Sequence, residues 1–108
     1  MALVMQATLH AVSSPRRRAI LKLVWNRELS AGEIASHFDV TWPAVSQNLR
    51  VLREAGLVRE RRQGTRRLYR ADRQSLRPLQ TILRRMWEAD LDRLRTLAER
   101  EERTKGPR

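Results

Sequence analysis

The chain has 108 residues, of which 23 are lysine or arginine and 12 are aspartate or glutamate, and its formal net charge is +11. It has no cysteine, which excludes disulfides, thiolate metal sites and a cysteine nucleophile. No apolar stretch reaches the roughly 18 residues that cross a bilayer, and a basic excess this large on one small domain indicates a polyanionic partner, most often nucleic acid.

The first third of the chain predicts three short helices. Apolar residues at near-helical spacing predict the first over residues 3–12. Ser14 is a suitable N-cap and Pro15 fits the first helical position, so a second helix is expected over about residues 15–25. The Ser-x-x-Glu pattern that begins at Ser30 is a capping box and opens the third helix.

The middle of the chain predicts a helix followed by a hairpin. Thr41 is expected to cap a fourth helix over residues 41–55, and Gly56 is a suitable residue to end it. Two short alternating runs, 57–62 and 66–70, flank a glycine-containing turn. They predict a two-stranded hairpin.

The end of the chain predicts one long helix over about residues 73–102, in which apolar residues recur every three or four positions. Such a helix spans about 45 Å, which is wider than so small a core. One chain cannot cover its whole apolar stripe, so we expect pairing with a second copy, the alternative being a helix folded back on its own domain. The expected dimer contacts are Leu3, Val4, Ala7, Leu79, Leu83, Met86, Trp87, Leu91 and Leu94.

These elements predict a single domain over residues 1–103 and a disordered tail over 104–108. The fold class is mainly α with a small β-hairpin wing: four helices, two strands and a long last helix, which together make a winged helix-turn-helix. The helix-turn-helix itself occupies residues 30–55. Its second helix is expected to enter the major groove of DNA, which admits one helix.

The outward face of this fourth helix carries the predicted base contacts. Gln47 can pair bidentately with adenine and Arg50 with guanine, whereas Ser46 can reach a base or a phosphate. Trp42 either packs on thymine methyl groups or covers part of the third helix, and the sequence leaves both open. The predicted DNA-binding set is Thr41, Trp42, Pro43, Ser46, Gln47, Arg50, Arg53, Arg61, Arg62, Arg66 and Arg67.

The predicted wing is the most basic part of the chain. Glu60 is its only acid, and its arginines are Arg59, Arg61, Arg62, Arg66, Arg67 and Arg70. Alternation places several of them on one strand face, which suits contact with the DNA backbone or minor groove; a charged edge strand that resists aggregation is the alternative. Arg16, Arg17 and Arg18, at the start of the second helix, are expected to add salt-sensitive phosphate contacts.

Four segments resemble the ArsR/SmtB family of repressors, in the family's order: AVSSPRRRAIL (11–21), LSAGEIA (29–35), PAVSQNLRVLREAGLV (43–58) and GTRRLY (64–69). The third is the strongest match, and the last is similar to the family's wing. The resemblance covers about residues 3–87. It implies a homodimeric winged helix-turn-helix repressor of bacterial or archaeal origin, whose first and last helices form the dimer and which a ligand or metal usually releases from DNA.

The sequence departs from the family pattern at functional positions. Asn48 stands where the family commonly has histidine, and Trp42 where it often has a basic residue. The cysteine pair that binds arsenite or cadmium is absent from residues 34–37, and no register of the family's zinc pattern places a histidine in the last helix. His10 and His37 lie on different predicted helices, too few for a transition-metal site. The resemblance therefore implies the metal-independent branch, without metal or cofactor.

Other functions remain as alternatives. The sequence contains no Ser-His-Asp set, Gly-rich phosphate loop or HExxH motif, so we do not expect an enzyme. A sequence-tolerant, nucleoid-like DNA-binding protein and a protein-interaction dimer module are both compatible with the pattern. A pocket near Met86 and Trp87 would suit a small apolar effector of unknown identity, with core packing as the alternative. No secretory leader pattern opens the chain, so we expect a cytoplasmic, nucleoid-associated protein whose partners are double-stranded DNA and a second copy of itself.

Overall fold

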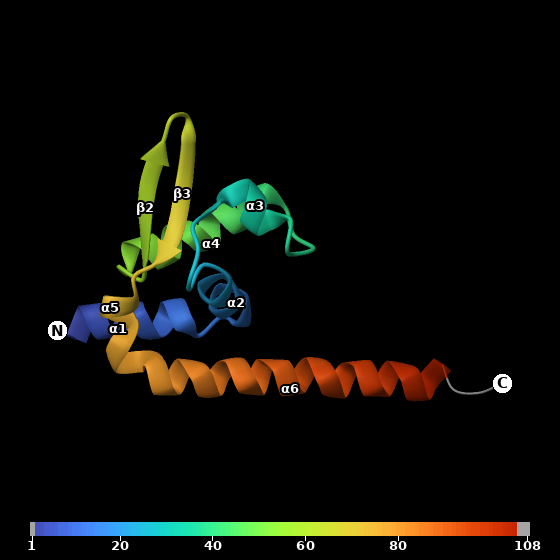
Figure 1. Ribbon diagram of the computed structural model, residues 1–108. Helices are drawn as coiled ribbons and strands as arrows, with labels where there is room; N and C mark the ends of the chain where they lie inside the picture. The colour runs from blue at the N-terminus through green and yellow to red at the C-terminus, as the bar shows by residue number, and fades with distance from the viewer. Residues whose placement is uncertain (1, 106–108) are drawn as a thin grey trace.

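The computed structural model describes the backbone of residues 2–105 and the side chains of residues 5–100. The helices are α1 (Ala2–Val12), α2 (Pro15–Leu23), α3 (Ala31–Ala35), α4 (Trp42–Glu54), α5 (Arg73–Leu76) and α6 (Gln80–Lys105), and a 3-10 turn, η1 (Arg77–Leu79), lies between the last two. The strands are β1 (Leu29–Ser30), β2 (Val58–Gln63) and β3 (Arg66–Ala71). In Figure 1 the β2–β3 hairpin stands at one end of the molecule and α6 lies along the other.

Local sequence signals start the helices where they were expected. The Ser14 side chain accepts a hydrogen bond from the first turn of α2 at 3.3 Å. The Ser30 hydroxyl accepts from the Glu33 N–H at 3.2 Å while the Glu33 carboxylate accepts from the Ser30 N–H at 3.0 Å, which completes the capping box. The Thr41 hydroxyl accepts from the Ala44 N–H at 3.3 Å. Each cap satisfies a backbone donor that a helix end leaves without a partner.

The predicted hairpin is confirmed, and a third strand lies beside it. Gln63 pairs with Arg66, which leaves a two-residue loop of Gly64 and Thr65. Gly64 has a φ of +63°, as the first central position of a type II′ hairpin turn requires. β1 pairs with the other edge of β3, so the strand order is β1-β3-β2. The sequence does not predict β1, because two residues are too few to show an alternating pattern.

The last helix, predicted as continuous from residue 73, is divided near its start. Pro78 lies in η1, between α5 and α6. Proline has no N–H to continue the helical ladder, so the ladder is interrupted there. The main helix α6 then begins at Gln80 and continues to Lys105, past the expected limit at 102. Residues 106–108 of the predicted tail lie outside the described residues.

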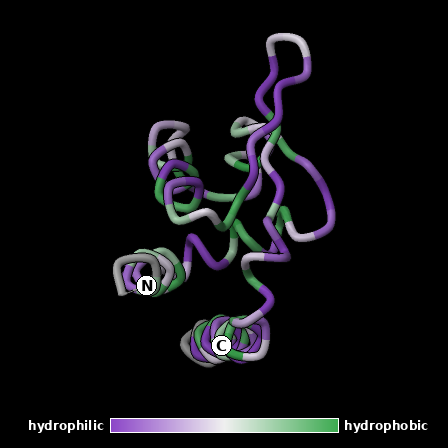
Figure 2. Tube along the Cα trace, turned by 90° about the vertical axis from the view of Figure 1, so that its left-hand side faces the viewer, coloured by the Kyte–Doolittle hydropathy of each residue, from purple (hydrophilic) through white to green (hydrophobic). Residues whose placement is uncertain are grey.

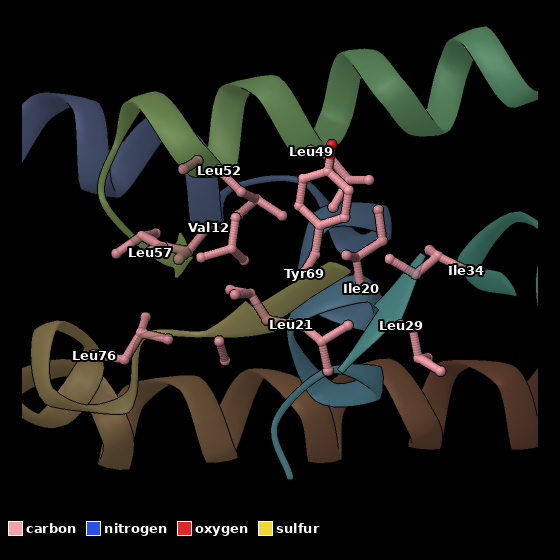
Figure 3. Packing of buried hydrophobic residues seen from close by; sticks show 14 of the residues in the cluster. Val12, Ile20, Leu21, Leu29, Ile34, Leu49, Leu52, Leu57, Tyr69 and Leu76 are labelled. Carbon is pink, nitrogen blue, oxygen red and sulfur yellow. The ribbon is translucent and has the colours of Figure 1, made fainter. Parts of the chain in front are cut away.

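The hydrophobic core lies between the helices and the base of the sheet. Figure 3 shows side chains from α2, α4, β3 and α5 meeting there, among them Ile20, Leu21, Leu49, Leu52, Tyr69 and Leu76. The predicted stripe of α4 is buried, with Val45, Leu49 and Leu52 each at most 1% exposed. Because this stripe faces inward, the opposite side of α4 is left to solvent.

Only the first turns of α6 pack into this core. Leu83 is 1% exposed, whereas Leu91, Leu94 and Leu97 are 50%, 65% and 50% exposed. Figure 1 shows the later part of α6 continuing beyond α2. Within residues 2–105, no helix combines the length and the apolar character that a bilayer span requires.

Candidate nucleic-acid interface

The solvent-facing side of α4 carries the residues predicted to contact bases. Ser46, Gln47 and Arg50 are all exposed. Arg50 Nε donates a hydrogen bond to Glu54 Oε1 at 3.0 Å, and both side chains are more than 60% exposed. An exposed pair of this spacing contributes only about 0.3–0.5 kcal/mol. Little stability is therefore lost if Arg50 leaves Glu54 for another acceptor.

The start of α4 combines a cap with an exposed tryptophan. Thr41 is occupied as the N-cap, and Pro43 lies in the first turn. The indole of Trp42 lies over Gly32 of α3, where an added Cβ would come within 2.8 Å of two ring atoms. Of the two roles predicted for Trp42, packing on the third helix is the one observed. Trp42 is still 59% exposed, and its contact with DNA remains a prediction.

The register of the hairpin places arginines directly opposite one another at two positions. Arg59 is opposite Arg70 on one face of the sheet, and Arg62 is opposite Arg67 on the other. Like charges in such pairs destabilise a sheet. Figure 2 shows hydrophilic residues along much of both strands. One arginine of each pair has a carboxylate partner, Asp72 for Arg59 and Glu60 for Arg67, which offsets part of this repulsion. An anionic ligand bound to the wing would offset more of it.

One carboxylate connects α4 to both strands of the wing. Glu60 of β2 approaches Arg53 of α4 through Oε2 and Arg67 of β3 through Oε1, the latter with Nε at 3.5 Å. The Glu60 side chain is 18% exposed, whereas those of Arg53 and Arg67 are 45% and 51% exposed. The two guanidiniums therefore retain N–H donors that face solvent. The sequence marks Glu60 only as the single acid of the wing. Its partners lie seven residues away in either direction, on other elements, where no local pattern indicates them.

The other predicted wing arginines differ in their partners. Arg61 donates through Nε and Nη2 to the Glu28 carboxylate at 2.9 and 2.8 Å, and this bond holds the pKa of Glu28 below its usual value. Since strand faces alternate, Arg61 lies on the face away from Glu60 and α4. Arg66 pairs with Glu33 of α3. Among residues 5–100, no ion-pair partner is found for the exposed Arg62.

Two adjoining hollows lie between the exposed side of α4 and the wing. One, of about 210 Å³, is lined by residues that include Arg50, Arg53 and Arg67. The other, of about 500 Å³, extends from Trp42 to the tip of the hairpin. Ser46, Arg67 and Tyr69 line both. The exposed side of α4 and one face of the wing therefore form the two walls of a single basic groove.

The arginines at the start of α2 differ from what the sequence predicts. Arg18 donates through Nε and Nη2 to the Asp90 carboxylate of α6 at 2.9 and 2.8 Å, and through Nη1 to the Val12 carbonyl at 2.7 Å. Its side chain is 9% exposed, so the expected phosphate contact is wrong for Arg18. Arg17 donates to two carbonyls at the end of α1, at 2.7 and 2.8 Å, and only Arg16 of the three remains exposed and without such a contact in the described structure.

The predicted dimer residues fall into two groups. Leu83 is buried in the core of its own chain, so its assignment to a dimer interface is corrected: no surface is left for a partner. Trp87 is half-buried, donates its indole N–H to the Arg18 carbonyl at 2.8 Å and meets Trp25 edge-on. Leu79 and Met86 are half-buried as well.

The other group remains accessible. Ala7, Leu91 and Leu94 are exposed, while the side chains of Leu3 and Val4 lie outside the described residues. A cavity of about 280 Å³ between α2 and α6 is lined by Trp87, Leu91 and Leu94 among others, but not by Met86. In the part of the chain that the structure describes, no three histidine or acidic side chains converge as a metal ion would need.

The chain is similar to known transcriptional regulators. Residues 14–60 match the family described as bacterial regulatory protein, arsR family. The HTH-type transcriptional regulator Rv2034 of Mycobacterium tuberculosis is 44% identical over 77 residues, 71% of this chain and 72% of that protein. The transcriptional repressor SdpR of Bacillus subtilis is 39% identical over 50% of this chain and 60% of its own length. The transcriptional activator HlyU of Vibrio cholerae is 32% identical over 73% of each protein.

Solved structures of such regulators share the fold. A homodimeric winged helix-turn-helix DNA-binding domain from Mycobacterium bovis, described as a possible ArsR-family regulator, superimposes with a TM-score of 0.68 and 30% identity. The match covers 75% of each chain. In a helix-turn-helix, the second helix is the one that enters the major groove. In this chain that helix is α4, and it forms the groove together with the adjacent hairpin.

Proposed function

The chain belongs to the ArsR family of bacterial regulatory proteins, and from this membership we propose that it is a homodimeric repressor that binds a pseudo-palindromic operator. It is a DNA-binding transcriptional regulator with a winged helix-turn-helix domain. The observation that supports the proposal most directly is the groove between α4 and the wing. One of its walls carries the exposed Ser46 and Arg50 of α4, and the other carries Arg66 and Arg67 of the wing.

In the proposed complex, α4 enters the major groove. Ser46, Gln47 and Arg50 reach base edges, because they share the exposed side of the helix and have the hydrogen-bonding groups that read adenine and guanine. The first turn of α4, with Thr41, Trp42 and Pro43, lies where the helix meets the DNA backbone. Phosphate contacts come from the arginines of the groove and the hairpin tip, Arg53, Arg62, Arg66 and Arg67. Arg61 is a weaker candidate, since it faces away from α4 and is already bound to Glu28.

The proposed dimer rests on the exposed leucines of α6. A helix that leaves Leu91, Leu94 and Leu97 at least half exposed is stabilised when a second copy covers them. Two-fold symmetry then places the two α4 helices in successive major grooves, about 34–36 Å apart. An operator with two inverted half-sites follows from this symmetry.

The decisive experiment is a binding selection from random DNA duplexes at near-physiological salt, with zinc in one arm and a chelator in another. We expect an inverted repeat whose recovery does not depend on zinc. Binding to every sequence without enrichment would favour a nucleoid-like protein, and loss of binding on adding zinc would contradict metal independence. A reporter with the recovered site overlapping its promoter should be silenced by the protein; activation would contradict the repressor role.

A variant of α4 tests the base-reading assignment. Arg50→Ala should weaken binding to the recovered site by about 1–3 kcal/mol and leave binding to unrelated DNA nearly unchanged. Arg84→Ala, which removes an exposed arginine of α6, is the control. Equal loss on both kinds of DNA would assign Arg50 to the backbone instead.

A pair of α6 variants tests the dimer. Leu94→Glu places a charge on the exposed apolar stripe and should give a monomer in analytical ultracentrifugation. Thr96→Glu adds the same charge on another side of the helix, where the hydroxyl donates to the Asp92 carbonyl, and should leave a dimer. A dimer in both variants would move the interface away from this part of α6.

A further inference from the structure

The Glu60 carboxylate is placed between two arginines that come from different elements. Its Oε2 approaches Arg53 Nη1 of α4 and its Oε1 lies 3.5 Å from Arg67 Nε of β3. Each oxygen therefore serves one guanidinium, and the carboxylate bridges them. Since β2, β3 and α4 each contribute one side chain, this bridge also connects the wing to the recognition helix.

The bridge leaves both arginines able to bind a further anion. A guanidinium has five N–H donors, and the contacts to Glu60 use one nitrogen of each. Arg53 and Arg67 both line the hollow of about 210 Å³ between α4 and the wing, and Arg67 also lines the adjoining hollow of about 500 Å³. A backbone that follows this groove meets their free donors in succession.

The charge balance of the groove depends on the same carboxylate. Glu60 offsets one of the two positive charges of Arg53 and Arg67, and its side chain is only 18% exposed. A carboxylate beside a phosphate site repels DNA of any sequence, so it lowers sequence-independent affinity. The carboxylate also holds the two arginine side chains in one conformation before DNA binds. If the complex needs that conformation, less side-chain entropy is lost on binding.

We propose that Glu60 is a specificity-determining residue of the DNA interface, which acts through Arg53 and Arg67. Its carboxylate holds both guanidiniums so that the groove accepts backbone phosphate in one register, the register in which α4 meets its bases. The negative charge of the same carboxylate disfavours binding of the DNA backbone in any other register. This inference rests on the proposed function, since it needs a preferred DNA sequence to act on.

The test measures the affinity of Glu60→Gln for the recovered operator and for unrelated DNA, each over a range of salt concentrations. Removing one negative charge should make the slope of log K against log salt concentration steeper by about one unit for non-specific binding. If the two proteins bind equally at 1 M salt, this slope corresponds to about eightfold tighter binding by the variant at 0.1 M salt. Affinity for the operator should change much less, so that the ratio of specific to non-specific binding falls by a similar factor. An unchanged ratio, or equal weakening on both DNAs, would overturn the proposal.

Two further variants separate geometry from charge. Glu60→Asp keeps the charge but is too short to bridge both arginines; it should lower the ratio without a steeper salt dependence. Glu28→Gln is the matched control, because it also neutralises a carboxylate bound to a wing arginine, Arg61, but on the other face of the sheet. It should leave the ratio unchanged. If Glu60→Asp behaved like the wild type, the role of Glu60 would be charge alone and the proposed positioning would be wrong.

The outcomes also distinguish this inference from the proposed function. A wild-type protein with no preferred sequence would overturn both. A wild-type protein with an operator, but with the same ratio in Glu60→Gln, would overturn the role of Glu60 alone. Urea unfolding of each variant shows whether a change in binding merely follows a change in stability.

Discussion

Arginine serves two different purposes at the two ends of this molecule. At the α6 end, Arg18 is bound to Asp90 and to a backbone carbonyl, and its side chain is 9% exposed. At the wing end, Arg53 and Arg67 share Glu60 and remain about half exposed. Residue type and carboxylate partner are alike in the two clusters. What differs is the number of N–H donors left for a ligand, and this separates an arginine that stabilises the fold from one that we propose binds DNA.

The Arg18 cluster joins three helices. The guanidinium of α2 reaches the end of α1 through Val12 and the middle of α6 through Asp90, and Trp87 of α6 donates to the Arg18 carbonyl. The helices that are proposed to form the dimer are thereby held against the helix that supports α4. The Arg18 and Asp90 side chains are 9% and 21% exposed, so removing Arg18 leaves a largely buried carboxylate without its ion-pair partner.

The largest expected effect on stability comes from breaking this cluster. Arg18→Ala leaves Asp90 charged and mostly buried, and should lower the free energy of unfolding by about 2–4 kcal/mol in urea denaturation. Arg16→Ala, two residues earlier and exposed, should change it by less than about 0.5 kcal/mol. Similar small losses in both variants would mean that the pair with Asp90 adds little, and the distinction between the two ends would fail.

The pH dependence of stability gives a second test of the same end. The hydrogen bonds from Arg18 hold the pKa of Asp90 below its ordinary value. A depressed carboxyl pKa stabilises the folded state fully above the unfolded-state pKa of about 3.9, and this stabilisation is lost as the pH falls through the folded-state value. The wild type should therefore lose stability more steeply below about pH 4 than Asp90→Asn, measured by urea unfolding. Parallel curves would contradict this.

At the wing end, the opposed arginines predict the reverse pattern, with a small effect on stability and a clear effect on DNA. Arg62→Ala removes one of two like charges that face each other, so the free energy of unfolding should stay within about 0.5 kcal/mol of the wild type or rise slightly. Its affinity for all DNA should fall, with a salt dependence weaker by about one unit.

Arg70→Ala is the matched control for Arg62→Ala. It removes one arginine of the other opposed pair, Arg59 and Arg70, which lies on the far face of the sheet. It should have the same small effect on stability and leave DNA binding unchanged. Equal loss of DNA affinity in the two variants would show that both faces of the wing contact the backbone.

The sequence predicts local features of both ends and misses their long-range contacts. The caps at Ser14, Ser30 and Thr41 depend on residues three positions apart, and the sequence is sufficient to locate them. The bond between Arg18 and Asp90 joins residues 72 positions apart, and no periodicity carries that information. For the same reason Leu83 was predicted to face a second copy: its place in the apolar stripe of α6 is evident, but what covers it depends on how α6 docks.

At the contact between α3 and the start of α4, two opposing contributions should leave a small net effect on stability. Gly32→Ala improves helix propensity by about 0.5–1 kcal/mol, but its Cβ would lie 2.8 Å from the Trp42 ring. The Trp42 side chain has room to move away, because the residue is 59% exposed. The free energy of unfolding should therefore change by less than about 1 kcal/mol. In fluorine NMR of fluorotryptophan-labelled protein, the Trp42 signal, identified with Trp42→Phe, should move more than those of Trp25 and Trp87.

The same variant separates the two roles of Trp42. If the indole over Gly32 also touches DNA, as proposed, displacing it should weaken operator binding by a few-fold, and Trp42→Ala should weaken it at least as much. An operator affinity unchanged in both variants would leave Trp42 with packing on α3 as its single role. The base contacts from α4 would then come from Ser46, Gln47 and Arg50 alone, one to two turns further along the helix.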